Sequence, residues 1–405
     1  MIDKLVLRCP FRKISEHGRE IWPSFRLADL GVPLEQSIDR DGHVFNTRHP
    51  WESIPSSYDS MAFKVFDHRY DPLDSFYIEF HASPAKIMQG HNVFGSSDFY
   101  DCCFALIELL AFAYPVLVER LDMPKCELAQ IDITFSSMAR DENEARAFIN
   151  ALCNVSYGQT KARTGYDGTA YFGKKNSRLK KIKVYGKGSE VLQTIKANER
   201  KADGHLLNEV YTDALIAFSQ PLIRWEASLY HRYLERHYNL DLTLKNLFRL
   251  NFFSSANQIT LWQNATYDLF NALKGQTMKL LNDDEIKDAL RAKFSKTSAK
   301  TGKVSTAAAD AAYRTYRDIR RDGWSIARAS MVTRTFDHHV KMLCECGLSR
   351  AALQNMNGLN DGAQIIPFVR FIQVDFGAQF PDWYEPQPPK HVYTPNPQPH
   401  LRLVA

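Results

Sequence analysis

The chain of 405 residues lacks several patterns that would place it in a class at once. Its seven cysteines form no C-x-x-C pair and are odd in number, which argues against a disulfide framework and against a zinc ribbon. The most apolar stretch, residues 104–121, is interrupted by Glu108 and Pro115 and is too short to span a bilayer. We therefore expect a buried core helix there, with no membrane contact. No signal-peptide pattern is visible, so we expect the protein to act in the cytoplasm of the cell that makes it.

A strong excess of either charge is also missing, because the formal net charge is only +5. The composition, 44% hydrophobic and 24% charged residues, is that of a globular protein. A chain of this length is too long for one ordinary core, so two or three domains are expected. The distribution of the basic residues is more informative than their sum.

Segments rich in β-branched and aromatic residues alternate with helical patterns through the first 235 residues. Strands are predicted at residues 5–8, 61–66, 76–81, 128–135, 169–172, 179–185 and 222–229. A helix is predicted to begin at Asp141, which precedes Glu142 and Glu144, and a polar helical segment at residues 189–219. The pattern predicts an α+β fold, in which residues 1–235 form an antiparallel-sheet domain with inserted helices.

The second half has helical periodicity almost throughout. Helices are predicted at residues 233–248, 257–273, 283–294, 307–321 and 334–346, with Gly323 and Gly347 as turn residues. From residue 386 onward prolines are frequent and apolar residues few, which is typical of a flexible tail. We therefore expect a mainly helical region at 236–385 and a tail at 386–405.

The segment KKNSRLKKIKVYGK, residues 174–187, holds seven basic residues and no acid. In a strand Lys181, Lys183 and Tyr185 share one face, because side chains alternate. Ammonium groups beside a tyrosine neutralise phosphate and favour the phenolate, as phosphoryl transfer to a tyrosine requires. Judged from this segment alone, a tyrosine in a basic strand is more commonly a half-buried or phosphate-facing aromatic residue than a nucleophile. The candidate nucleic-acid contacts here are Lys174, Lys175, Arg178, Lys181 and Lys183.

Candidate metal ligands come from acids inside apolar strand patterns, where a charge is costly unless it is paired or metal-bound. They are Asp132, Glu79 and Glu226, with His91 as a possible nitrogen ligand. Hard oxygen ligands suit Mg²⁺, or Mn²⁺. Two simpler interpretations stay open. Arg224 can pair with one of the acids, and a histidine beside glycine is commonly a turn residue.

Long strings of the chain match one family. They include ASPAKIMQGHNVFG at 82–95, I-D-x-T-F at 131–135, R-x-E-A at 224–227, P-x-V-R-F-I at 367–372 and P-D-W-Y at 381–384. On these strings the chain resembles the gene II replication initiators of filamentous phages (inoviruses), nearly from end to end. The chain departs from the family pattern at two positions. Gln130 stands where relatives often carry arginine, and His81 stands where a relative carries lysine. The chain also lacks the His-hydrophobe-His metal clamp of many rolling-circle nickases.

The resemblance implies nicking of the viral strand at the phage origin, a 5′-phosphotyrosine intermediate, and later rejoining of the displaced strand. The family pattern S-R-x₆-Y-x-K falls on residues 177–187, which implies Tyr185 as nucleophile and Lys187 as its cationic neighbour. Similarity to plasmid initiators raises Tyr171 as a rival. The implied partners are duplex and single-stranded origin DNA and a host polymerase. A host helicase is also implied, since no Walker-type loop is present.

Origin recognition is expected in the basic region 303–353, which contains a candidate helix-turn-helix. Its predicted second helix carries Arg334 and Lys341, although an ordinary solvated helix face fits the same pattern. Relatives also make a shorter, C-terminal product by starting translation inside the gene. Met278 lies at the matching position here, so we expect such a fragment from this gene. Two other functions remain as alternatives: a non-catalytic origin-binding protein or repressor, and a metal-dependent nuclease that uses water and forms no covalent link.

Overall fold

A computed structural model describes residues 1–385, apart from 70–72, 158–159, 165–167, 203, 275–282, 298–301, 303 and 357–367. The expected tail at 386–405 and the candidate internal start at Met278 lie outside the described residues.

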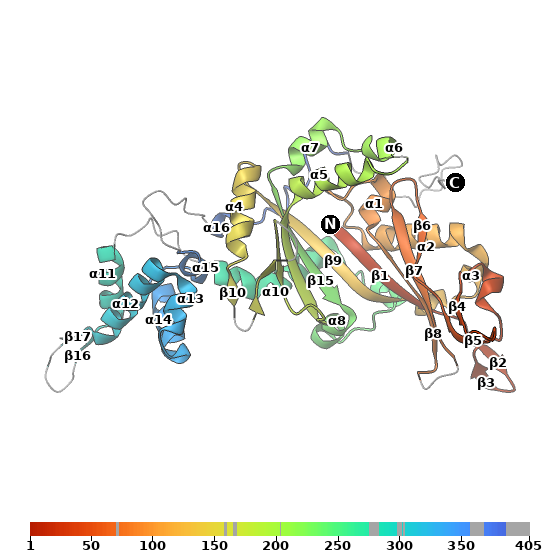
Figure 1. The fold of residues 1–405 in the computed structure, drawn as a ribbon, viewed down its shortest axis with the longest axis horizontal. Helices are drawn as coiled ribbons and strands as arrows, with labels where there is room; N and C mark the ends of the chain where they lie inside the picture. The colour runs from red at the N-terminus through yellow and green to blue at the C-terminus, as the bar shows by residue number, and fades with distance from the viewer. Residues whose placement is uncertain are drawn as a thin grey trace.

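A nine-stranded sheet forms the centre of the structure (Figure 1). Its strand order is β12-β13-β14-β15-β9-β1-β8-β7-β6, and every neighbouring pair is antiparallel. The strands are β1 (Ile2–Pro10), β6 (Glu52–Pro55), β7 (Ser60–His68), β8 (Ser75–Ala82), β9 (Glu127–Met138), β12 (Arg163–Thr164), β13 (Thr169–Phe172), β14 (Lys180–Gly186) and β15 (Leu222–Tyr230). The predicted α+β class with an antiparallel sheet is confirmed.

The two faces of the sheet differ because side chains alternate along each strand. In β1, Leu5, Leu7 and Cys9 are fully buried, whereas Lys4 and Arg8 lie on the opposite face and are partly exposed. The apolar face, here the inner face, packs against α2 (Phe99–Ala113), α4 (Glu142–Leu152) and α10 (Ser255–Leu273). The polar face, here the outer face, carries the residues discussed below.

Three predicted helical stretches are each divided in the structure. One of them, the polar segment 189–219, forms the three helices α5 (Lys187–Asn198), α6 (Gly204–Asn208) and α7 (Asp213–Ser219). The stretch 104–121 was predicted as one core helix, but it breaks at Tyr114 into α2 and α3 (Pro115–Glu119), because proline begins a helix more readily than it continues one. The stretch 233–248 forms α8 (His231–Tyr238) and α9 (Leu244–Arg249), since Asn239 adopts a left-handed conformation with φ 48°. Asp141 caps α4 as predicted and accepts a hydrogen bond from the Glu144 amide.

The sheet's core extends past residue 235, where the sequence pattern placed the end of the sheet domain. Leu261, Trp262 and Leu269 of α10 are buried in the same apolar cluster as the strands. A second cluster belongs to the helices that follow and lie to one side of the sheet in Figure 1. These helices are α11 (Asp283–Phe294), α12 (Ala307–Asp322), α13 (Trp324–Ala329), α14 (Thr333–Glu345) and α15 (Arg350–Gln354).

Several small elements carry little apolar patterning, and the two-stranded hairpins among them were not predicted. Two-stranded hairpins are formed by β2 (Ile14–Glu16) with β3 (Arg19–Ile21), by β4 (Glu35–Ile38) with β5 (Val44–Arg48), by β10 (Ser156–Tyr157) with β11 (Thr160–Lys161), and by β16 (Lys296–Thr297) with β17 (Val304–Ser305). The remaining elements are η1 (Leu27–Leu30), η2 (Met123–Lys125), α1 (Pro84–Gln89) and α16 (Phe368–Ile372). Among the described helices, none has the length and apolar character needed to cross a membrane.

After the helical unit the chain returns to the sheet. Residues 368–385, here the C-terminal strap, begin with α16, whose Phe371 is buried in the sheet's core. Arg370 binds Glu144 of α4 through two hydrogen bonds of 3.1 and 2.9 Å. The strap then reaches Phe94, whose ring lies 4.6 Å from that of Tyr384. Segments nearly 300 residues apart in the chain are thus packed together.

Candidate active site

Tyr185 lies on the outer face of the sheet, near the end of β14. Ile182 and Val184 are buried on the inner face, so alternation directs Lys183 and Tyr185 outward. Tyr185 is paired in register with Thr169 on one side and Arg224 on the other. It is 4% exposed, and Lys183 Nζ lies 4.1 Å from its ring centroid. The predicted grouping of Tyr185 with a lysine on one strand face is present in the structure.

The surroundings of Tyr185 do not favour the phenolate, as the sequence pattern had suggested. Burial, together with the nearby carboxylates of Asp3 and Glu226, raises the pKa of Tyr185 well above its ordinary value. Its hydroxyl makes no hydrogen bond to any described residue. The neutral phenol is therefore the stable form in the free protein, and ionisation requires that the negative charges around it be offset.

Three buried carboxylates lie beside the tyrosine, on adjacent strands of the outer face. Glu226 of β15 is paired in register with Lys183 and receives its ammonium group at 3.4 Å. Asp132 of β9 accepts a hydrogen bond of 2.7 Å from Gln130. Asp3 of β1 lies where the register between β1 and β9 shifts. Their exposed fractions are 8%, 4% and 7%, respectively.

The pKa values of two of these carboxylates, Glu226 and Asp132, are raised. Burial and the charges of Asp132 and Asp3 raise the pKa of Glu226 to about 8, against the opposing effect of Lys183. Burial also raises the pKa of Asp132, to which Asp3 contributes. Hard oxygen donors of this kind are the ligands that Mg²⁺ and Mn²⁺ prefer, and a divalent cation offsets the repulsion between them. The three carboxylates are of the donor type that such an ion takes, although their oxygens do not all lie within 4.8 Å of one another.

Lys187 is connected to this acidic group through Asn92. Lys187 is fully buried at the start of α5; its Nζ donates to Asn92 Oδ1 at 2.7 Å and binds Glu190. Asn92 Nδ2 in turn donates to Asp3 Oδ1 at 2.7 Å. Burial lowers the pKa of Lys187 to about 8, and the ammonium group lowers the pKa of Glu190 to about 2. Its Nζ lies 6.0 Å from the Tyr185 ring centroid.

Arg224 holds the loop after α1 against the sheet. The side chain is 1% exposed and donates to the carbonyl oxygens of Asn92, at 3.0 Å, and Val93, and to Ser136 Oγ at 3.1 Å. A buried ion pair between Arg224 and one of the acids, the simpler interpretation of the sequence, is not present. Backbone carbonyls accept the guanidinium hydrogen bonds instead, so Arg224 does not pair with the carboxylates.

The structure brings together only some of the predicted metal ligands. Asp132 and Glu226 lie with Asp3, which sequence reasoning missed although it interrupts the apolar start of the chain in the same way. Glu79 lies on β8, beyond β1, and is bound to Arg8 at 2.9 Å. His91 contacts Gln89, and its pKa is lowered to about 4 by burial and by the charges of Lys187 and Arg224. Its charged neighbours are thus cations.

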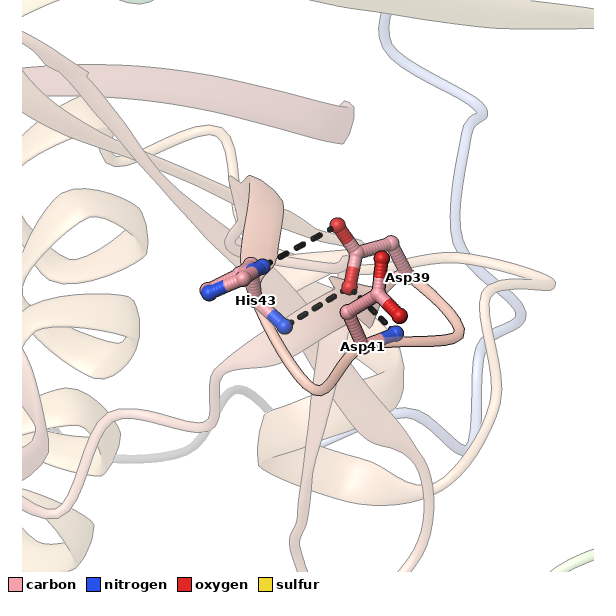
Figure 2. A group of neighbouring side chains, drawn as sticks. All are labelled: Asp39, Asp41 and His43. Carbon is pink, nitrogen blue, oxygen red and sulfur yellow. Dashed lines mark hydrogen bonds and ion pairs between the residues drawn. The ribbon is translucent and has the colours of Figure 1, made fainter.

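In one other group of potential metal ligands the ligand atoms lie closer together than in the group formed by Asp3, Asp132 and Glu226. Asp39, Asp41 and His43, in the turn between β4 and β5, are the single described set of three whose ligand atoms all lie within 4.8 Å (Figure 2). The Asp39 carboxylate already accepts the amides of Asp41 and His43, at 3.0 and 2.8 Å. All three residues are exposed. These contacts stabilise the turn, so the group needs no ion to explain it.

The predicted DNA-contacting residues lie in two places. Lys174, Lys175 and Arg178 are exposed at the β13–β14 turn, whereas Lys181 Nζ lies 5.2 Å from the Tyr230 ring centroid and Lys183 is in the site. Arg334 and Lys341 are exposed on α14, which follows α13 after residues 330–332. This arrangement has the helix, turn and helix that the sequence predicted. The rival nucleophile Tyr171 faces Lys183 from β13 and is partly exposed.

An antiparallel sheet with a tyrosine, lysines and carboxylates on one face suits a protein that works on phosphodiesters, and the comparisons agree with a replication role. Residues 1–258 match the family described as the N-terminal part of a phage replication-associated protein, and residues 299–389 match the family described as its C-terminal part. The chain belongs to this family of phage replication-associated proteins, and the resemblance seen in the sequence is confirmed.

Relatives match over nearly the whole chain. The chain is 33% identical to the replication-associated protein of Enterobacteria phage fd, and equally to that of Enterobacteria phage M13, over 95% of this chain and 98% of each relative. The same protein of Salmonella phage IKe is 33% identical over 95% of this chain and 96% of its own length. No solved structure matches.

Proposed function

We propose that this chain initiates rolling-circle replication by nicking the viral strand of phage DNA at its origin. The Tyr185 phenol loses its proton, and its oxygen attacks the scissile phosphorus while the 3′ oxygen leaves and is protonated. The product is a 5′-phosphotyrosine link, which conserves the energy of the phosphodiester. A 3′ hydroxyl later attacks this link, releases Tyr185 and circularises the displaced strand.

The observation that carries this proposal is the position of Tyr185 between two lysines and three buried carboxylates. Lys183, whose pKa is raised mainly by Glu226 against the effect of burial, stays charged and neutralises the phosphate. Lys187, paired with Glu190 and with a pKa of about 8, is an ammonium ion near neutral pH and adds a second positive charge beside the phenol.

Asp3, Asp132 and Glu226 would hold Mg²⁺ or Mn²⁺, and the ion when bound polarises the scissile phosphate. We do not include Glu79, which is bound to Arg8 on the far side of β1. His91, with Lys187 and Arg224 around it, is better placed toward the phosphate than toward the carboxylates.

We further propose that α13 and α14 read the duplex origin, with Arg334 and Lys341 facing the DNA. The chain then works in the host cytoplasm with a host helicase and a host polymerase, which unwind and copy the nicked strand.

The decisive experiment uses a supercoiled plasmid that carries the phage origin, Mg²⁺, and a label on the 5′ phosphate of the nick. Wild-type protein, Tyr185→Phe and Tyr171→Phe are compared under denaturing conditions. We expect protein-linked label with wild type and Tyr171→Phe, and none with Tyr185→Phe. Label that persists in Tyr185→Phe would move the role to Tyr171 or another tyrosine.

The same assay separates the two alternative functions. Nicks without linked label would indicate a nuclease that uses water. Origin binding without nicks would indicate a non-catalytic origin-binding protein or repressor.

A further inference from the structure

The outer face of the sheet continues from the candidate active site into a cluster of aromatic side chains. On β7 and β8, the positions that alternate outward are occupied by Phe66, Tyr77 and His81, and Trp51 lies just before β6. Phe66 and Tyr77 are stacked, with ring centroids 4.9 Å apart. The Trp51 ring lies 5.2 Å from His81 and 6.4 Å from Phe66. We call these four residues the aromatic platform.

The platform is partly exposed to solvent, although it consists of side chains that normally seek burial. Trp51 is 47% exposed, and Phe66, Tyr77 and His81 are partly exposed. The inner face of the same strands holds Phe63, Ile78 and Phe80, which are 0–1% exposed. Core packing therefore accounts for the inner positions but not for the outer rings, whose contacts among the described residues are with one another and with cations.

Cations are interleaved with these rings. The Arg8 guanidinium lies 4.8 Å from the Tyr77 centroid, and Lys64 Nζ lies 5.3 Å from that of Phe66. Burial lowers the pKa of His81, and the nearby charge of Lys4 adds to this effect. Arg8 binds the carboxylate of Glu79, but Lys4 and Lys64 have no ion-pair partner among the described residues. The charge that this surface leaves unneutralised is therefore positive.

The register of the strands connects the platform to the active site. Lys4 of β1 is paired with Asp132 of β9, and Val6 of β1 is paired with both Gln130 and His81. From β14, which carries Tyr185, to β7 there are five steps across the sheet. At about 4.8 Å for each step, this is a path of about 24 Å on one continuous face.

We propose that the aromatic platform binds single-stranded DNA next to the cleavage site, a conclusion that rests on the proposed function. Unpaired bases stack on Trp51 and on the Phe66–Tyr77 pair, while Lys4, Lys64 and Arg8 contact the phosphates. Rings interleaved with cations on an open face are how proteins hold single strands without reading their sequence. A duplex does not fit this chemistry, because its bases are already stacked on one another.

The test is the affinity for a fluorescein-labelled oligothymidylate, measured by anisotropy with full-length protein in EDTA. We expect Trp51→Ala to bind about tenfold more weakly, and Trp51→Phe to recover most of the loss, because stacking on one ring contributes about a factor of ten. Lys64→Gln should lower the dependence of log K on log salt by about 0.7. Tyr267→Ala, which removes an aromatic ring that is 61% exposed on α10, is the matched control and should bind like wild type.

Duplex DNA of random sequence is measured in parallel, and its affinity should not respond to Trp51→Ala. Equal losses for duplex and single strand, or no loss for either, would overturn the proposal. A changed sedimentation coefficient of Trp51→Ala with unchanged oligothymidylate affinity would show a protein interface and would overturn it as well. Circular dichroism melting of each variant excludes unfolding as the cause.

Failure of this inference and failure of the proposed function can be told apart, because oligothymidylate binding needs no chemistry. Protein-linked label with wild type, but unchanged oligothymidylate binding by Trp51→Ala, would reject the platform alone. Absence of label with wild type, together with the expected effect of Trp51→Ala, would reject the phosphotyrosine mechanism alone.

Discussion

Gln379 and Ser136 are 243 residues apart in the chain and are joined by two hydrogen bonds. The Ser136 amide donates to Gln379 Oε1 at 2.8 Å, and Gln379 Nε2 donates to the Ser136 carbonyl at 3.0 Å. Strand β1 pairs with β9 only as far as Ile133, so β9 has a free edge at Ser136. The side-chain amide of Gln379 makes the two hydrogen bonds to Ser136 that the backbone of a neighbouring strand would otherwise make. The C-terminal strap is therefore fastened to the strand whose Ser136 hydroxyl receives Arg224.

We expect Gln379→Ala to lower the free energy of unfolding by about 1–2 kcal/mol, because it leaves an amide and a carbonyl of Ser136 without partners. If the strap positions Arg224, kcat for nicking should fall more than KM rises. Urea unfolding and steady-state nicking rates measure the two effects. Gln373→Ala, at an exposed position of the same strap, is the control and should behave like wild type. Equal changes of stability and of nicking rate in Gln379→Ala and Gln373→Ala would mean that the strap has no specific link to the site.

The Lys187–Glu190 pair should make stability depend on pH in acid. The folded pKa of Glu190, about 2, lies below its ordinary 4.5, so the unfolded chain binds more protons between these values. This contribution is complete above pH 4.5 and is lost as the pH falls toward 2. Glu190→Gln should reduce the free energy of unfolding at pH 7 by about 2 kcal/mol and flatten the acid dependence. Urea titrations at several pH values measure this.

The matched control for that experiment is Glu199→Gln, at an exposed position next to the end of α5. It should retain the acid dependence of the wild type. If Glu190→Gln also retained it, the ion pair with Lys187 would contribute nothing to the folded state.

Much of the sheet could be predicted from the sequence, because alternation is a local signal. Strand β13 and helix α11 have the predicted limits, and the cap at Asp141 forms as expected. The hairpins between residues 14 and 48 are mostly exposed, so burial imposes no alternation that a pattern search can find. The membership of α10 in the sheet's core depends on contacts between distant segments, which local periodicity does not report.

The active site was predictable only where a charge interrupts an apolar strand. Asp132, Glu226 and Glu79 gave the same signal in the sequence, yet Glu79 lies across β1 with Arg8 as its partner. Asp3 joins the acids at an irregularity in strand pairing, and pairing is a tertiary property. The carbonyl partners of Arg224 come from a loop far away in the chain. The sequence therefore indicated which residue types to expect in the site, whereas the order and pairing of the strands decide which of these residues lie together.

If Asp3, Asp132 and Glu226 hold a divalent cation, Mn²⁺ should raise the melting temperature of the wild-type protein. Asp3→Asn and Glu226→Gln should each weaken Mn²⁺ binding by about tenfold or more, as loss of one carboxylate ligand removes both a donor and a charge. Isothermal titration calorimetry measures the affinity without any need for activity. Glu79→Gln is the control, and we expect it to bind Mn²⁺ like wild type. Loss of binding in Glu79→Gln instead would restore that residue as a ligand.

The role of α14 in reading the duplex can be separated from a solvated helix face by salt dependence. Each phosphate contact that is lost lowers the slope of log K against log salt by about 0.9 for duplex DNA. We expect Arg334→Ala and Lys341→Ala each to show this change on an origin duplex. Arg236→Ala, which removes an exposed cation of α8, should leave the slope unchanged. If all three variants keep the wild-type slope, the cations of α14 only solvate the helix, and origin recognition must lie on another surface, such as the exposed lysines of the β13–β14 turn.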